Sequence, residues 1–209
     1  MNEIILGAAL DYYEKHDYIE PVVLNLDLYP HLLLAGASGT GKTYALEWYL
    51  EQLADLNYNL TIADYKGEIK GCNYAGESVL NGIDAFYQDY KIKDLKKCLV
   101  IDEYPAYISF LKLRDQKKAK DVKEKIAEML MMGRSYQSLI WIVTQRPDAD
   151  LFIGGARDNL HCKILLGNGS KEAQTMMFGS EEIEEANFKR GEGIYSLGGS
   201  TIHTLKVPK

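Results

Sequence analysis

The sequence lacks the long apolar run that a membrane-spanning helix requires. Such a helix needs about 20 consecutive, mostly apolar residues, and the apolar stretch Ile4–Leu10 near the start of the chain is far shorter. Asn2 and Glu3 precede this stretch, where a signal peptide would carry basic residues. We therefore expect neither a signal peptide nor a membrane segment of its own, and we expect the chain to work in the cytoplasm.

Cysteine is scarce, and an excess of basic residues is absent. The three cysteines, Cys72, Cys98 and Cys162, form no CxxC pair, which argues against a disulfide framework or a cysteine metal site. The formal net charge is −6, whereas a protein that grips nucleic acid over its whole surface normally carries an excess of Lys and Arg. This charge balance still leaves room for a local basic region.

No internal repeat or biased stretch divides the 209 residues of the chain. This length is enough for one well-buried domain and is short for two domains of ordinary size. We expect an N-terminal helical segment over residues 1–19, containing a helix at Ala8–Tyr18, followed by a single domain over residues 20–209.

Apolar runs alternate with helical patterns along most of the chain, which is typical of an α/β domain with a mostly parallel sheet. Apolar residues spaced three and four apart predict helices around residues 46–53, 79–87 and 119–130. The end of the chain predicts a β-hairpin with strands at Ile194–Ser196 and Thr201–Val207. The earlier strands, whose continuous apolar character predicts helices on both faces of the sheet, are Val22–Leu26, His31–Ala35, Leu60–Ala63, Cys98–Ile101, Leu139–Thr144 and Lys163–Leu166.

A glycine-rich segment lies between a predicted strand and a predicted helix, and it fits the phosphate-binding pattern GxxxxGK[ST] without a mismatch. Its glycines let the backbone wrap closely around phosphates, and its N–H groups point inward at a helix N-terminus. Lys42 would bridge the β- and γ-phosphates, and the Thr43 hydroxyl would bind Mg²⁺. We expect this P-loop to bind ATP through Gly36, Ala37, Ser38, Gly39, Thr40, Gly41, Lys42 and Thr43.

Two acids follow the predicted strand Cys98–Ile101. The end of a parallel strand would place Asp102 beside the P-loop, where it can hold Mg²⁺ through the ion's water shell. Glu103 could then polarise an attacking water as a general base, which favours hydrolysis over transfer to another acceptor. The alternative is a solvated turn that happens to contain two acids.

Gln145 follows the predicted strand Leu139–Thr144. An amide in this place could contact the γ-phosphate or the catalytic water and report the state of the nucleotide. Taken alone, the position favours an ordinary residue at a strand end over this sensor role.

Several segments together resemble the FtsK/SpoIIIE/HerA superfamily of ring-forming ATPases that pump DNA. Tyr29–Gly36 resembles the stretch leading into its P-loop, Ala63–Gly67 its D-x-K-G element, and Leu99–Glu103 its Walker B strand. Gly133-Arg134-Ser135 followed by Thr144–Pro147 resembles its G-R…T-Q-R-P signature, and Gly191–Tyr195 resembles its closing G-x-G hairpin. The resemblance runs in order from about residue 20 to residue 207.

The resemblance implies a RecA-like (ASCE) P-loop NTPase fold, in which the Gln145 strand lies between the P-loop strand and the Walker B strand. It also favours the sensor role for Gln145. It further implies a homo-oligomeric ring, a hexamer, in which an arginine from a neighbour completes each ATP site. The candidates for this catalytic arginine are Arg134 and Arg157, ahead of Arg146, whose place in the signature favours a role within its own subunit.

The densest basic stretch comprises Lys112, Arg114, Lys117, Lys118 and Lys120. In the superfamily, loops that follow the Walker B strand line the pore of the ring, so these side chains could track a DNA backbone. They could equally form a solvated helix face, since acidic residues alternate with lysines just downstream.

These features favour an ATP-hydrolysing ring motor that moves double-stranded DNA for a mobile element, in conjugative transfer, segregation or genome packaging. A related motor that acts on a protein substrate, as in secretion systems, is the alternative. A slowly hydrolysing, nucleotide-switched assembly protein is a third class, which the Asp102–Glu103 pair disfavours. In each case a partner protein, or the N-terminal segment, would recruit the motor to its substrate.

Overall fold

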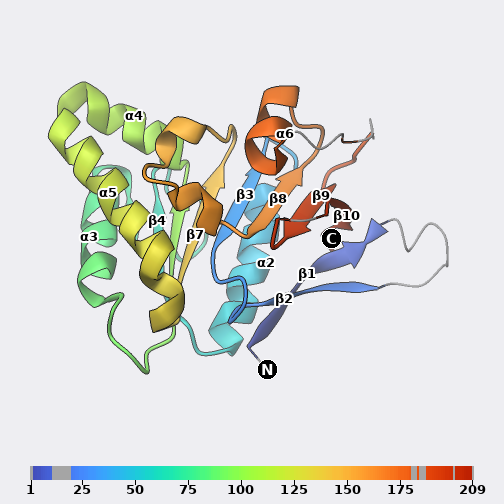
Figure 1. Ribbon diagram of the computed structural model, residues 1–209, viewed down its shortest axis with the longest axis horizontal. Coiled ribbons are helices and arrows are strands. Elements are labelled where there is room, and N and C mark those ends of the chain that lie inside the picture. The colour runs from blue at the N-terminus through green and yellow to red at the C-terminus, as the bar shows by residue number, and fades with distance from the viewer. Residues whose placement is uncertain (1, 11–19, 180–182, 184–186, 200, 209) are drawn as a thin grey trace.

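The computed structural model describes residues 2–10, 20–179, 183, 187–199 and 201–208. Its described strands form one sheet in the order β2-β1-β10-β9-β8-β3-β7-β6-β4-β5 (Figure 1). The strands are β1 (Glu3–Ala9), β2 (Pro21–Asn25), β3 (Leu32–Gly36), β4 (Asn59–Asp64), β5 (Tyr74–Ala75), β6 (Lys97–Asp102), β7 (Ser138–Thr144), β8 (Cys162–Leu166), β9 (Glu192–Leu197) and β10 (His203–Lys206).

The described α-helices are α2 (Lys42–Asp55), α3 (Val79–Asp89), α4 (Tyr104–Arg114), α5 (Gln116–Met132) and α6 (Lys171–Phe178). Short 3₁₀ turns lie before α3, after α5 and between β7 and β8, namely η1 (Gly76–Ser78), η2 (Gly133–Tyr136), η3 (Ala149–Leu151) and η4 (Ala156–Asn159). None of these described helices has the length and apolar character that crossing a bilayer requires.

The parallel part of the sheet runs from β8 to β5, and β7 lies between β3 and β6. This is the strand order that the resemblance predicts for a RecA-like fold. Every residue of β3 and of β7 is buried, as expected for strands covered on both faces. Because parallel strands end at the same edge of a sheet, the residues that follow β3, β6 and β7 come together there.

Helices cover both faces of the sheet, as predicted. One face packs against α2 through Leu46, Tyr49 and Leu53, and the ring of Tyr49 meets the buried Trp141 of β7 edge-on, with ring centroids 6.3 Å apart. The other face packs against the helices α3, α4, α5 and α6. The two apolar layers hold the carboxyl ends of the central strands in fixed positions.

The predicted C-terminal hairpin is confirmed, since β9 pairs with β10 in antiparallel register. The predicted helical segment over residues 1–19 is wrong for residues 3–9, which form β1 in the main sheet between β2 and β10. Ile4 and Leu6 are buried while Ile5 is exposed, so burial follows the two-residue period of a strand. The remainder of the predicted helix Ala8–Tyr18, from residue 11 onward, lies outside the described residues.

Candidate nucleotide site

The P-loop connects the end of β3 to the start of α2, and its backbone has a positive φ at Gly36, Gly39 and Gly41. Gly41 has φ 101°, and Gly36 has φ 151°. These are angles that other residues rarely adopt. A Cβ on Gly36 would also lie only 2.5 Å from the carbonyl oxygen of Leu166. The loop therefore depends on backbone conformations and close approaches that larger residues would disrupt.

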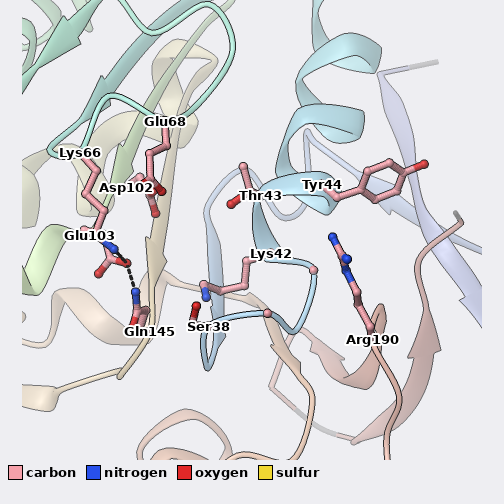
Figure 2. A pocket seen from close by; sticks show the side chains of 12 residues that line it. Ser38, Lys42, Thr43, Tyr44, Lys66, Glu68, Asp102, Glu103, Gln145 and Arg190 are labelled. Carbon is pink, nitrogen blue, oxygen red and sulfur yellow. Dashed lines mark hydrogen bonds and ion pairs between the residues drawn. The ribbon is translucent and has the colours of Figure 1, made fainter.

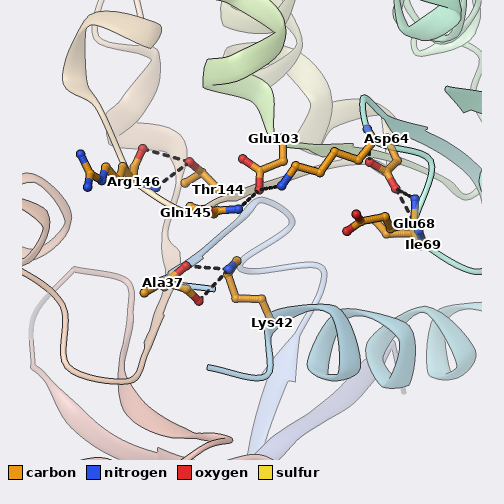
Figure 3. Close-up of polar contacts among 11 residues, drawn as sticks. Ala37, Lys42, Asp64, Glu68, Ile69, Glu103, Thr144, Gln145 and Arg146 are labelled. Atoms are coloured by element: carbon orange, nitrogen blue, oxygen red, sulfur yellow. Dashed lines mark hydrogen bonds and ion pairs between the residues drawn. The ribbon is translucent and has the colours of Figure 1, made fainter. Parts of the chain in front are cut away.

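Lys42 is the first residue of α2, and its side chain folds back over the loop. Its Nζ donates hydrogen bonds to the carbonyl oxygens of Gly36, at 2.6 Å, and Ala37, at 3.1 Å (Figure 3). Burial lowers the pKa of Lys42, and the nearby carboxylates of Glu103 and Asp102 oppose this shift. The N-terminus of α2 has no side-chain cap and no acidic residue in its first turn. Its N–H groups are therefore available to an anion.

A cavity of about 260 Å³ opens over the P-loop. It brings together most of the site residues predicted from the sequence, including Lys42, Thr43, Asp102, Glu103 and Gln145. Figure 2 shows the two acids and Gln145 on one side of Lys42, with Tyr44 and Arg190 on the other. The full lining is Ser38, Gly39, Gly41, Lys42, Thr43, Tyr44, Lys66, Glu68, Asp102, Glu103, Gln145 and Arg190.

Asp102 is the last residue of β6 and stands beside the last residue of β4, Asp64. Burial, and then the neighbouring carboxylates of Asp64 and Glu103, raise the pKa of Asp102 to about 7. Crowded carboxylates of this kind favour a cation among them. The metal-binding role of Asp102 stays a prediction.

Glu103 immediately follows β6 and occupies the N-cap position of α4 in a left-handed conformation, with φ 54° and ψ 38°. Such a conformation costs about 1–2 kcal/mol for a residue other than glycine, and residues held in this way concentrate at functional sites. The Glu103 side chain is only 11% exposed. Its Oε1 accepts hydrogen bonds from Gln145 Nε2 at 2.7 Å and from Lys66 Nζ at 3.0 Å (Figure 3).

Sequence reasoning missed four side chains that line the cavity, namely Tyr44, Lys66, Glu68 and Arg190. Lys66 belongs to the Ala63–Gly67 element that the resemblance singled out, so a signal for it was present. Arg190 directly precedes the closing hairpin, where Gly191 N donates to the P-loop carbonyl of Thr40 at 2.9 Å. That contact brings the end of the chain against the P-loop, which no local pattern reveals.

None of the three arginines named as candidates lines this cavity. Arg134 lies in η2, before the start of β7 and therefore at the opposite edge of the sheet, and its Nε donates to the carbonyl of Asp27 at 3.2 Å. Arg157 lies in η4, which packs against α5. A contribution to the site of a neighbouring subunit does not require contact with the chain's own cavity, so the role of Arg134 or Arg157 stays a prediction.

The basic stretch lies on two helices and not on a loop. Lys112 and Arg114 are in the last turn of α4, and the lysines begin α5. Asp115 separates the helices and caps α5 by accepting hydrogen bonds from the backbone N–H groups of Lys117 and Lys118. The arrangement is a rigid corner, here called the basic corner, made of residues 112–120.

A family model for the Helicase HerA-like C-terminal domain matches residues 13–135, more than half of the chain. The FtsK domain-containing protein YdcQ of Bacillus subtilis (strain 168) is 24% identical over 211 residues. That alignment covers 87% of this chain but only 44% of YdcQ, so the chain spans less than half the length of this curated relative.

Solved structures share the fold at low identity. The pCW3 conjugation coupling protein TcpA, in its monomer form with ATPγS, superposes with a TM-score of 0.78 at 16% identity, over 98% of this chain and 65% of TcpA. The cytoplasmic domain of the type VII secretion ATPase EccC from Thermomonospora curvata gives 0.73 at 18% identity, over 99% and 28% of the two chains. The genome packaging NTPase B204 of Sulfolobus turreted icosahedral virus 2, with AMPPCP, gives 0.60 at 16% identity, over 86% and 98%.

The matched family model agrees with the structure. The structure has the strand order of a RecA-like fold, a P-loop after β3 and two acids at the end of β6. The chain belongs to the Helicase HerA-like C-terminal family, within the FtsK/SpoIIIE/HerA superfamily of RecA-like, nucleotide-binding P-loop ATPases.

Proposed function

We propose that this chain binds Mg-ATP at the P-loop and hydrolyses it to drive a ring-shaped motor in the cytoplasm. One observation carries the proposal: Lys42 faces the same cavity as the Asp102–Glu103 pair although it lies far from that pair in the sequence. An amine for the phosphates, a carboxylate for a metal and a second carboxylate for water are the parts that ATP hydrolysis needs.

The residues around the cavity fit a bound Mg²⁺. The Thr43 hydroxyl and the Asp102 carboxylate supply hard oxygen ligands, which this ion prefers. When bound, Mg²⁺ neutralises the charge that develops on the phosphates during transfer. Lys42 would leave its bonds to the P-loop carbonyls for the β- and γ-phosphate oxygens, and Glu103 would take a proton from the attacking water.

A second cavity lies next to the first and suits the nucleoside part of ATP. It has a volume of about 400 Å³, and Gly41, Tyr44 and Arg190 line both cavities. Its other lining residues are Lys189, Gly191, Val207 and Pro208. A base bound there would contact both an aromatic ring and apolar surface, while the phosphates of the same nucleotide reach the P-loop.

We infer that the polymer moved by the motor is double-stranded DNA, on behalf of a mobile element. The superfamily, the fold shared with a conjugation coupling protein and the fold shared with a genome packaging NTPase support this inference. The basic corner offers a local surface for phosphates on a chain of net charge −6. One 209-residue domain cannot surround a duplex, so the proposed motor is a homo-oligomer, a hexamer by family resemblance, brought to its DNA by a recruiting partner.

The proposal is tested by measuring the ATPase rate with and without duplex DNA, alongside the mass of the protein in solution. We expect DNA to stimulate hydrolysis and to promote assembly at low salt. A protein with no ATPase activity, with or without DNA, would contradict the proposal.

A protein substrate is the second candidate, because the fold is also shared with the type VII secretion ATPase EccC. One EccC structure is described in complex with a signal sequence peptide. This candidate predicts hydrolysis that duplex DNA leaves unchanged. ATPase activity that is present but insensitive to DNA, with no assembly on it, would favour this candidate.

A further inference from the structure

Lys66 stands out among the residues that line the cavity, because its ammonium group meets the proposed general base directly. Lys66 Nζ lies 3.0 Å from Glu103 Oε1, and the hydrogen bond to Glu103 is the main cause of a raised pKa for Lys66. The Lys66 side chain is 40% exposed and that of Glu103 is 11% exposed. The charge of this lysine is therefore placed at the rim of the site, against a carboxylate inside it.

The segment that carries Lys66 is fixed by the buried carboxylate of Asp64. Asp64 Oδ1 accepts the backbone N–H of Lys66 at 2.9 Å, and Oδ2 accepts those of Glu68, at 2.5 Å, and Ile69, at 2.9 Å (Figure 3). Gly67 follows with φ 72°, in the left-handed region that favours glycine. Residues 65–69 belong to no regular helix or strand, and this folding after β4 presents Lys66 to Glu103.

Both donors to the Glu103 side chain bind the same oxygen. Gln145 reaches Oε1 from the end of β7, and Lys66 reaches it from the turn after β4. Within the described residues, Oε2 has no hydrogen-bond partner. A carboxylate that is held by one oxygen and free at the other has a fixed orientation and a lone pair left for a water molecule.

We propose that Lys66 is a positioning residue for hydrolysis: together with Gln145 it fixes Glu103 Oε1, so that Oε2 faces the water that attacks the γ-phosphate. This role rests on the proposed function, because it assumes that Glu103 acts on water during ATP hydrolysis. It assigns Lys66 to the carboxylate and not to the phosphates, which Lys42 would contact from its place between the Glu103 side chain and Arg190 (Figure 2).

The first test compares kcat and KM for ATP in Lys66→Met. Met keeps much of the side-chain length but has no charge and donates no hydrogen bond, so Glu103 would lose one of its two anchors. We expect kcat to fall about 10- to 100-fold, the loss typical of a misplaced catalytic group. KM and the Kd for ATPγS should stay within about threefold, and Lys66→Arg should restore much of kcat because it keeps a cationic donor.

Lys70→Met is the matched control, because Lys70 belongs to the same connecting segment but lines a different cavity, between α2 and β4. Its ATPase rate should equal that of the wild type. ATPγS binding and thermal melting would verify that each variant is folded.

The second test repeats Lys66→Met in a Glu103→Gln background. If Lys66 acts through the Glu103 carboxylate, the double variant should be no slower than Glu103→Gln alone. An equal further loss in this background, or a tenfold rise in KM with kcat unchanged, would overturn the positioning role. A wild-type protein that does not hydrolyse ATP would instead contradict the proposed function itself.

Discussion

Gln145 Nε2 donates to Glu103 Oε1 across 2.7 Å, which joins the ends of the neighbouring strands β7 and β6 (Figure 3). An amide at this place was predicted to sense the γ-phosphate or the catalytic water. The geometry shows that it touches the proposed base, so any report of the nucleotide state from Gln145 would pass to Glu103 directly. A substitution at Glu103 therefore has to be judged by whether the new side chain can still accept the hydrogen bond from Gln145.

Glu103→Gln should keep nucleotide binding and lose most hydrolysis. The amide oxygen of the new side chain can still accept the hydrogen bond from Gln145, so the local structure persists while the base is removed. A general base typically contributes 10²- to 10⁴-fold, and we expect a loss of about this size in kcat with an unchanged Kd for ATPγS.

The control for this measurement is Glu51→Gln, the same chemical change at an exposed position on α2, outside the nucleotide cavity. It should leave the rate unchanged. Turnover by Glu103→Gln at a near wild-type rate would show that another group activates the water.

The parts of the site that lie within one continuous segment were predictable from the sequence. The P-loop and the Asp102–Glu103 pair are each local patterns between elements with strong apolar character, so their positions at the sheet edge followed once the fold class was recognised. The hydrogen bond between Gln145 and Glu103 was not predictable in the same way. It depends on β7 lying beside β6, which the resemblance implied and the apolar patterns alone did not.

The parts that were missed depend on tertiary structure. Lys66 reaches the site because Asp64 folds the turn after β4, and Arg190 reaches it because Gly191 bonds to the P-loop. The strand β1 was missed for a different reason. A short apolar run such as Ile4–Leu10 fits a helix and a strand equally well, and pairing with β2 and β10 decides between them.

Substitution of the arginine proposed to act between subunits should abolish hydrolysis without loss of nucleotide binding. An arginine donated in trans is worth about 10³- to 10⁵-fold in rate, so Arg134→Ala or Arg157→Ala should show a loss of this size. Arg134→Ala also loses a hydrogen bond to Asp27, and thermal melting would separate that effect from catalysis. Lys171→Ala, on the exposed start of α6, is the control and should be fully active.

Mixing experiments can then show whether the site is shared between subunits. The inactive arginine variant has an intact P-loop, and Lys42→Ala has an intact arginine, so a mixed ring contains some complete interfaces. We expect partial recovery of activity when Lys42→Ala is present in excess. Absence of recovery at every ratio, or full activity of both arginine variants, would argue against these residues.

The burial of His31 should contribute a loss of stability on mild acidification, which the raised pKa of Asp102 opposes. His31 precedes β3, and burial, assisted by the neighbouring His161, lowers the pKa of His31 from 6.5 to about 3. Between these values the unfolded chain binds a proton that the folded chain does not, so this group lowers the free energy of unfolding as the pH falls through this window. From pH 7 to pH 5 this group alone should cost about 2 kcal/mol.

Urea unfolding at the two pH values measures the effect in the wild type and in His31→Asn. The Asn side-chain oxygen can replace His31 Nδ1 as acceptor for the backbone N–H of Ile140, which lies 3.0 Å away. Relative to the wild type, the unfolding free energy of this variant at pH 5 minus that at pH 7 should therefore be more positive by about 2 kcal/mol. His203→Asn, at an exposed position, should keep the wild-type difference. Equal pH dependence in His31→Asn and the wild type would contradict the role of His31.

Charge reversal in the basic corner should weaken the response to DNA more than the basal ATPase rate. Lys117 and Lys118 are exposed on the first turn of α5, remote in sequence from the P-loop. Acidic residues are favourable near a helix N-terminus, and Asp115 caps this helix through backbone N–H groups that the substitutions retain. The double variant that carries Lys117→Glu and Lys118→Glu should therefore fold normally and lose only its contacts with DNA phosphates.

The measurement is the ATPase rate against duplex concentration at several salt concentrations. Because phosphate contacts release counterions, the wild-type response should weaken as salt rises, and the double variant should show a smaller salt dependence. Lys93→Glu with Lys171→Glu makes the same change in net charge at exposed positions elsewhere, and it should respond to DNA more strongly than the Lys117 and Lys118 variant. If both double variants lose the DNA response equally, overall charge and not the basic corner governs binding. If duplex DNA stimulates none of the proteins, including the wild type, a protein substrate becomes the better explanation for the motor.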